Sequence, residues 1–290
     1  MAKYYFIERR REMNKIISIL MFGVSNKKLR LSFALAGFFG IFGSANAAGL
    51  CFQGDDEHCL SARFGVGGLY SNFSGSGAGV NNYGGFVNVE VTEAYKRFQA
   101  MLGIRVEGGG ASFKGSTLAN LGLGSAFFGE ETKVKLGANV LTKRVPLFIN
   151  FVFGNEYYST NFGTVQKSGF ERLVLNLGLE LQGAIPLGGK SRLEYSAGAS
   201  AVSAYYVLAK TYEARSRVDD FGLGVSASVG FANEINDRYE WYARVVGKYQ
   251  NLGTSKGVPF YQNGGTTSTA TINYPASNNF AGMLEVGLGF

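Results

Sequence analysis

Hydrophobic and polar residues alternate with a period of two along most of the chain after residue 60. In 170–183, FERLVLNLGLELQG, every second residue from Leu173 to Leu181 is leucine, while Arg172 and Glu180 fall on the opposite face. Successive side chains of a strand point to opposite faces, whereas a helix mixes these two sets. The pattern therefore predicts an all-β chain.

Ten segments carry this alternation. They are 61–71, 83–92, 97–108, 131–141, 146–157, 169–183, 190–208, 218–232, 239–250 and 279–290. Most are longer than the 5–6 residues typical of soluble strands, and a tilted strand that crosses a bilayer needs about 9–11 residues. Eight or twelve strands stay open as alternatives, because 111–130 contains the weaker strand-like piece LANLGLGSAFF.

The connections between these segments alternate between short and long. Short ones fall at 93–96, 142–145, 184–189 and 232–238; longer or more polar ones fall at 72–82, 109–130, 158–168, 209–217 and 251–278. A meander with tight turns at one end and loops at the other is the plan of a transmembrane antiparallel β-barrel. An even strand count places both termini on the periplasmic side.

Aromatic residues favour the barrel over a soluble β-sandwich, which would have shorter strands and more frequent turn signals. They gather near the predicted strand ends, as in the aromatic girdles of membrane barrels. These residues are Tyr70, Phe73, Tyr83, Tyr157, Tyr158, Tyr205, Tyr206, Tyr239, Trp241 and Tyr249.

The first 47 residues have the three parts of a secretory signal peptide in order. A positive region at 27–30 precedes the apolar run 31–43, LSFALAGFFGIFG, and the cleavage pattern Ser44-Ala45-Asn46-Ala47 follows. We expect cleavage after Ala47, a periplasmic segment at 48–60 and a barrel at 61–290. The leader is long, and translation could start at Met1, Met13 or Met21.

Charge gives no sign of nucleic-acid binding in the exported part. Of the formal net charge of +7, residues 1–47 contribute +6 through 8 Lys/Arg and 2 acids, and the remainder has 20 Lys/Arg and 19 acids. A nucleic-acid-binding domain shows a basic patch, which this balance excludes.

The last strand resembles the C-terminal assembly signal of bacterial outer-membrane β-barrel proteins, which ends in an aromatic residue. Leu288 and Phe290 match its two terminal hydrophobic positions, whereas Glu285 stands where a glycine is usual. The resemblance covers the leader, the meander and this ending, and it names a class of proteins, with no specific family. It implies location in the outer membrane, with the assembly machinery and membrane lipid as partners.

Strand alternation assigns sixteen charged residues to the barrel interior. They are Arg63, Glu90, Arg97, Arg105, Glu107, Lys133, Lys135, Glu156, Arg172, Glu180, Arg192, Glu194, Glu240, Arg244, Lys248 and Glu285. The two signs are nearly balanced, and ten strands enclose a narrow lumen. We expect a filled, ion-paired lumen, with a small passive, porin-like channel as the alternative.

Catalysis is the weakest reading. The ten-stranded omptin proteases use paired acids and a histidine at the outer rim, and barrel lipid A deacylases need a Ser–His pair. The only histidine, His58, precedes the first predicted strand, so Asp219 and Asp220 lack such a partner at the outer rim. The G-x-S-x-G match at 253–257 lies in a Gly/Ser/Thr loop, without the strand–turn–helix that this motif requires. We therefore predict no enzyme activity beyond a weak possibility of a rim hydrolase.

Cys51 and Cys59 flank a short acidic segment, and in an oxidising compartment we expect a disulfide between them. A metal site from these cysteines with Asp55, Asp56 and His58 is the alternative, although the spacing does not match a closed zinc site. The Gly clusters at 75–79 and 108–110 do not form phosphate loops, and we predict no cofactor.

The longest predicted outer loop, 251–278, is polar and carries Phe260, Tyr261 and Tyr274. Exposed loops on a rigid scaffold are where binding commonly occurs. The leading hypothesis is a structural or adhesive surface barrel whose loops contact host surfaces or phage; a loop without a dedicated ligand is equally consistent with the sequence.

Overall fold

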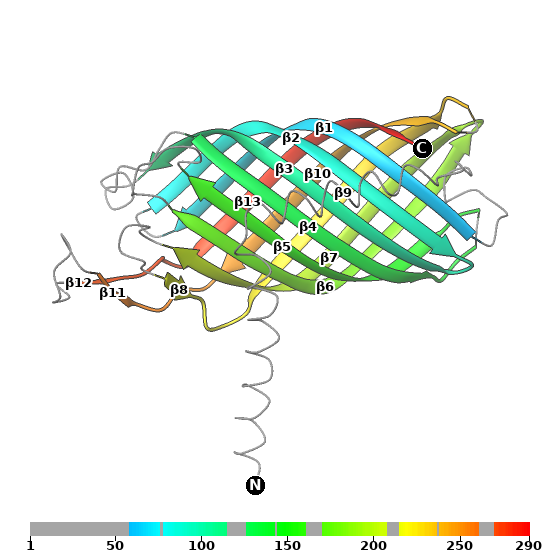
Figure 1. Cartoon of the computed structure of the whole chain (residues 1–290). Helices are drawn as coiled ribbons and strands as arrows, with labels where there is room; N and C mark the ends of the chain where they lie inside the picture. Colours follow the sequence, from blue (N-terminus) through cyan, green and yellow to red (C-terminus); the bar gives the residue numbers. More distant parts are fainter. Residues whose placement is uncertain are drawn as a thin grey trace, which may run out of the picture. The chain divides into compact units, whose positions relative to one another are not determined.

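The computed structural model describes residues 58–75, 78–114, 126–142, 144–160, 170–207, 215–236, 238–260 and 270–290. Ten long antiparallel strands of these residues form a closed barrel, which confirms the predicted fold (Figure 1). They are β1 (His58–Gly75), β2 (Ala78–Tyr95), β3 (Phe98–Lys114), β4 (Ala126–Asn139), β5 (Leu147–Thr160), β6 (Glu171–Gly188), β7 (Ser191–Val207), β9 (Gly222–Glu234), β10 (Glu240–Leu252) and β13 (Ser277–Gly289). In the described part of the chain, no helix is long and apolar enough to cross a membrane.

The ring closes between β1 and β13. Their register runs from Arg63 opposite Gly289 to Gly75 opposite Ser277, and β10 pairs with the other edge of β13. Beyond the last strand residue, the Phe290 N–H donates to the Ala62 carbonyl at 2.9 Å, and the Ala62 N–H donates to the Phe290 carbonyl at 2.7 Å. Each of the ten strands thus has a partner on both edges, which satisfies the backbone as a bilayer requires.

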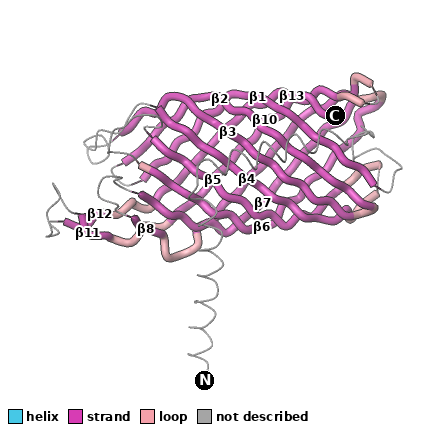
Figure 2. The backbone as a smooth tube through the Cα atoms, viewed as in Figure 1, coloured by secondary structure: helices cyan, strands magenta, loops and turns pink. Residues whose placement is uncertain are grey.

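The two ends of the barrel differ (Figure 2). The connections at 96–97, 140–146, 189–190 and 235–239 lie at one end, here called the turn end. The β6–β7 turn uses Gly188 and Gly189 at φ of 101° and 58°, a region that glycine enters without steric cost. At the opposite, loop end, β8 (Arg215–Arg217) pairs with β7, and β11 (Val258–Phe260) pairs with β12 (Ala270–Ile272).

Several strands are longer than predicted. β1 begins at His58, so the last residues of the predicted segment 48–60 are strand residues. β1 and β2 also continue through the predicted loop 72–82, which leaves only 76–77 between them. This stretch is rich in Ser, Asn and Gly, but backbone pairing such as Ser74 with Gly79 extends the ladder without regard to side-chain polarity.

Glycines allow β2 and β3 to approach closely at Gly84 and Gly109, which are direct partners in the register. A Cβ placed on Gly84 would lie 2.2 Å from the carbonyl oxygen of Gly108, and one on Gly109 would lie 2.1 Å from that of Tyr83. No side chain fits at such distances, so both positions require glycine.

The alternation separates an apolar outer wall from a polar and aromatic inner wall. Side chains such as Leu102, Leu179 and Leu284 are exposed on the outside. The predicted girdle is only partly correct, because Phe73, Tyr158 and Tyr206 are buried inside the barrel, whereas Tyr70, Tyr83, Tyr239, Trp241 and Tyr249 are exposed.

Candidate functional site

The lumen is the candidate site, because almost all charged residues predicted to point inward meet there. At the turn end, Arg63 of β1 reaches across to Glu194 of β7 and Glu240 of β10, with closest N–O distances of 2.6 Å to each. Arg192 of β7 bonds to Glu194 at 2.8 Å and also pairs with Glu240. These four residues form the turn-end cluster, in which Arg192 and Glu240 are 1% and 0% exposed.

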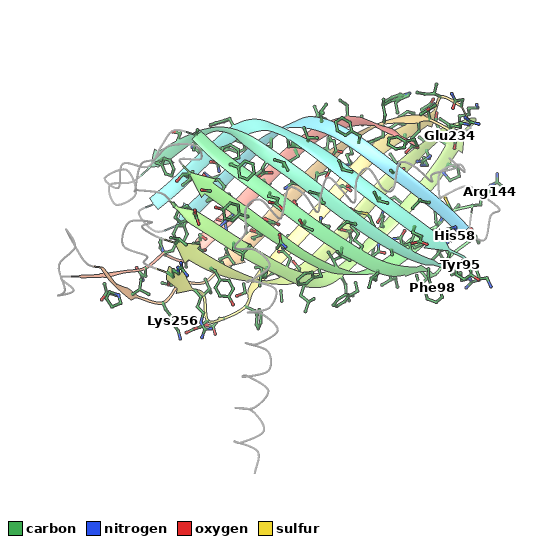
Figure 3. All side chains as sticks on the ribbon, in the orientation of Figure 1. His58, Tyr95, Phe98, Arg144, Glu234 and Lys256 are labelled. Carbon is green, nitrogen blue, oxygen red and sulfur yellow. The ribbon has the colours of Figure 1, made fainter. Side chains whose placement is uncertain are left out.

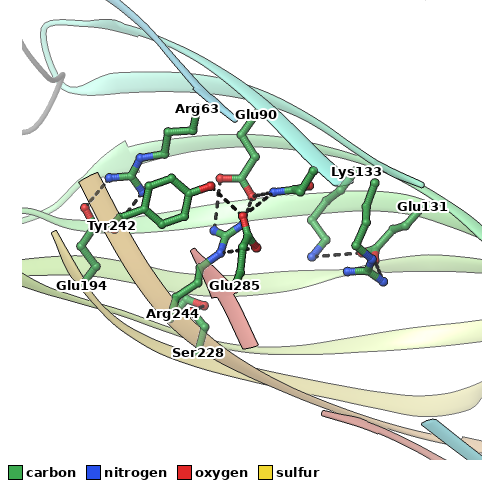
Figure 4. A network of polar contacts seen from close by, with 12 residues as sticks. Arg63, Glu90, Glu131, Lys133, Glu194, Ser228, Tyr242, Arg244 and Glu285 are labelled. Carbon is green, nitrogen blue, oxygen red and sulfur yellow. Dashed lines mark hydrogen bonds and ion pairs between the residues drawn. The ribbon is translucent and has the colours of Figure 1, made fainter. Parts of the chain in front are cut away.

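A second group, the central cluster, joins Glu90 of β2, Arg244 of β10 and Glu285 of β13 (Figure 4). Arg244 donates to Glu90 at 2.5 Å and to Glu285 at 2.9 Å. Tyr242 donates its hydroxyl to Glu285 at 2.6 Å, and Asn88 donates to the same carboxylate at 3.2 Å. The buried carboxylate therefore has both charge and hydrogen-bond partners, as a buried ion requires.

A third group, the loop-side cluster, is centred on Glu131 of β4. Its carboxylate pairs with Arg105 of β3 and Lys248 of β10, and with Lys133 at 3.3 Å. Lys248 also lies 3.4 Å from Glu156 of β5.

Two further ion pairs lie near this cluster. Arg105 bonds to Glu107 at 3.0 Å, and Lys135 pairs with Glu180 of β6.

Beyond these ion pairs, the loop end of the lumen is filled by the aromatic group Phe73, Phe127, Tyr158, Phe170, Tyr206 and Tyr274. Tyr274, which precedes β13, stacks on Tyr206 with ring centroids 4.5 Å apart and on Phe170 at 5.3 Å. The Ser255 N–H donates to the Tyr274 carbonyl at 2.9 Å, and the Tyr274 N–H donates to the Ser255 hydroxyl oxygen at 2.7 Å, which holds this segment in place. Burial raises the pKa of the Tyr274 phenol, and the positive charge of Arg172 acts in the opposite direction.

The lumen formed by the described residues contains cavities of ≈ 100, ≈ 50 and ≈ 40 Å³. Glu131 and Lys248 line all three. A water molecule needs roughly 10–15 Å³ on this measure, so each cavity has room for a few waters or one small ion.

The structure places fifteen of the sixteen predicted lumen charges on the inner wall, and Arg97 is the correction. Arg97 lies in the turn between β2 and β3 and is exposed. The prediction failed because β3 begins at Phe98, one residue after Arg97, so the alternation of a strand does not apply to it. The sequence reasoning missed Glu131, although it shares the parity of Lys133 and Lys135 in the same segment. It also missed Glu234, whose carboxylate lies 3.9 Å from Arg192 at the turn end.

The predicted loop residues have different outcomes. Tyr274 is 2% exposed, so it is part of the lumen filling and cannot serve as an exposed binding residue. Phe260 lies in β11, and Tyr261 lies outside the described residues. At the last strand, Leu288 faces outward and Phe290 pairs through its backbone with Ala62.

The predicted leader 1–47, the cysteine Cys51 and the acids Asp55 and Asp56 lie outside the described residues. Cys59 is buried and disulfide-bonded, and its pairing with Cys51 stays a prediction.

The chemical groups of a rim hydrolase lie far apart. His58 bonds to Glu93 at 2.9 Å at the turn end, whereas Lys256 marks the loop end (Figure 3). Asp219 pairs with Lys256 at 3.0 Å and with Arg217 at 3.5 Å, and all three are about half exposed. The sequence has one histidine, so this acid cannot form the acid–histidine arrangement of the omptin rim.

No family model and no curated protein matches the chain. Among solved structures, the outer membrane protease OmpT from Escherichia coli matches with a TM-score of 0.58 and 10% identity over 80% of this chain and 96% of OmpT. The translocator domain of the autotransporter NalP from Neisseria meningitidis matches with a TM-score of 0.42 and 12% identity over 89% of this chain and 97% of that domain. At such low sequence identity, the likeness to these structures shows the fold alone. The chain has the fold of bacterial outer-membrane β-barrels.

Proposed function

We propose that this protein is an outer-membrane barrel with a closed lumen, which serves as a rigid platform for loops at the cell surface. The apolar outer wall and the ring of paired strands suit a bilayer, and the predicted signal peptide would export the chain. The turn end, with its short connections, would then face the periplasm, and the loop end would face outward.

The turn-end cluster is the observation that carries the closed-lumen proposal. Arg63 crosses from β1 to β7 and β10, and Arg192 and Glu240 have almost no exposed surface. Opening this region would leave buried charges without partners, which costs about 3–5 kcal/mol for each broken pair. The aromatic group would close the lumen at its other end.

Planar-bilayer recording of the refolded full chain tests this proposal. We expect no reproducible conductance steps from the wild type. A variant with Arg63, Arg192, Glu194 and Glu240 all replaced by Ser, together with Tyr206→Ala and Tyr274→Ala, serves as the positive control and should conduct. Stable, uniform open steps from the wild type would contradict a closed lumen.

A narrow passive channel is the second candidate, and the wall formed by β7 and β9 favours it. The inward residues there are small: Ser196, Gly198 and Ser200 on β7, and Gly224, Ser226 and Ser228 on β9. They line two of the cavities and leave space along one side of the lumen. Small uniform steps that disappear when Ser200 and Ser226 are both replaced by Phe would favour this candidate.

The proposed surface role rests on the position of the loops, and host or phage molecules are the proposed partners. Replacing 261–269 by a short Gly-Ser segment keeps Tyr274 in the aromatic group, so the barrel should still fold. We expect loss of adhesion or phage adsorption by cells that display this variant, with unchanged surface abundance. If the variant binds every partner of the wild type unchanged, the proposal that this loop carries the binding site would be contradicted.

An enzymatic role is not part of the proposal, because the sole histidine lies at the turn end, away from Asp219.

A further inference from the structure

Arg172 of β6 is a buried cation that forms no ion pair within the described part of the chain. Its side chain is almost fully enclosed at 4% exposure, and its Nε and Nη1 atoms have no hydrogen-bond partner among the described residues. The guanidinium carbon lies 3.8 Å from the centroid of the Phe73 ring and 5.9 Å from that of Tyr158. Aromatic faces stabilise a cation, but they do not satisfy its N–H donors.

Four acids line the same cavity as Arg172; three of them are engaged by other residues, and Glu130 is the fourth. Glu131 pairs with Arg105 and Lys248, and Glu107 accepts from Arg105 at 3.0 Å. Glu156 accepts from Gln250 at 3.1 and 3.2 Å and lies 3.4 Å from Lys248. None of these four acids forms an ion pair with Arg172 among the described residues, so its Nε and Nη1 donors stay without an acceptor there.

A small cavity adjoins this guanidinium. It measures ≈ 40 Å³, and its lining includes Arg172, Phe73, Tyr158 and Asn279. Asn279 of β13 lies opposite Phe73 in the strand register, and neither atom of its side-chain amide has a hydrogen-bond partner within the described part of the chain. Two strands from separate parts of the barrel thus present unsatisfied donors to one cavity.

We propose that this cavity binds one small monovalent inorganic anion of about the size of chloride. Arg172 supplies the countercharge and two N–H donors, and the Asn279 amide supplies a further donor, so the anion satisfies groups that are otherwise costly to bury. The volume excludes larger organic carboxylates. A second negative charge on the ligand would add to the repulsion from Glu107, Glu130, Glu131 and Glu156, which line the same cavity, so the site suits a monovalent anion only.

Thermal unfolding of the refolded full chain in detergent micelles tests the site. Sodium chloride is titrated against sodium gluconate at constant ionic strength, because gluconate is too large for the cavity. The unfolding midpoint should rise by a few degrees with chloride and then saturate, as expected for a ligand that binds the folded state. Arg172→Met should abolish this dependence.

Lys135→Met is the matched control, because Lys135 is a buried lumen cation that pairs with Glu180 and does not line this cavity. It should retain the full chloride response. A wild-type midpoint that is independent of chloride, or an equal response in Arg172→Met, would overturn the proposal.

Diffraction from wild-type crystals soaked in bromide gives a test that does not depend on a variant that folds. We expect an anomalous peak within hydrogen-bond distance of both Arg172 and Asn279. A cavity that contains only water and shows no bromide peak would also overturn the proposal.

Discussion

At the scale of single residues, the stability of the lumen depends on whether each buried charge has a partner. Glu240 contacts Arg63 and Arg192 and is fully buried, whereas Glu234 lies 3.9 Å from Arg192 and is partly exposed. The cost of desolvating a buried ion is offset only by close partners, so Glu240 and Glu234 should contribute very differently to the free energy of unfolding.

Glu240→Gln should lower the free energy of unfolding by about 3 kcal/mol, since it removes the negative charge shared by two buried arginines. Urea unfolding in lipid vesicles, followed by tryptophan fluorescence, measures this loss. The control Glu234→Gln should change stability by less than about 1 kcal/mol, as expected for a more distant and more exposed pair. Equal effects of the two changes would contradict the assigned role of the turn-end cluster.

Gly84→Ala should destabilise the barrel, because its Cβ would lie 2.2 Å from the Gly108 carbonyl oxygen. Overpacking of this kind costs about 1–3 kcal/mol, and the displaced atom here is backbone. Gly68→Ala is the matched control, since its nearest neighbour would be 4.0 Å away. The same urea unfolding assay compares the two, and a loss of stability in Gly68→Ala as large as in Gly84→Ala would refute the close approach of β2 and β3.

At the scale of the strand, alternation sets which side chains face lipid. The position of a residue along the strand sets how much an outward polar side chain would cost in stability. On β6, Leu179 lies in the middle of the outer wall and Leu187 lies next to the turn; both are exposed on the outside. The same parity rule located the inward charges, and it failed at Arg97 only because the strand had already ended.

Leu179→Arg should therefore cost about 2–4 kcal/mol of stability in vesicles, and Leu187→Arg only about 0–1 kcal/mol, because the penalty for an outward cation depends on its depth in the bilayer. Refolding yield and urea midpoints in vesicles measure the difference. Similar costs at both positions would mean that the outer wall does not face a bilayer as proposed.

At the scale of the whole molecule, the barrel is a ring in which every one of the ten strands is paired on both sides. Such a ring has no weak edge from which to unravel, so it should stay folded in detergent until heated. The folded protein should run at a lower apparent mass on a gel without boiling than after boiling. Identical migration before and after boiling would count against a closed ring.

The pattern of residues along the chain was enough to predict the all-β class, the ten strands, the inward parity of most charges and the alternation of turns with loops. It could do so because side-chain orientation in a strand follows from spacing along the chain alone. Strand ends were less accurate, since backbone pairing continued through the polar residues of 72–82.

The identity of the charge pairs depends on the folded barrel, because β1, β7 and β10 come together only when the ring closes. The folded structure also shows that Tyr274 enters the lumen and that Glu131 joins three cations. Arg172 is the clearest case: the sequence shows one more inward charge, whereas the fold places it against Phe73 and Tyr158 and leaves its Nε and Nη1 without a partner among the described residues. Contacts across the lumen join residues far apart in sequence, and no local pattern records them.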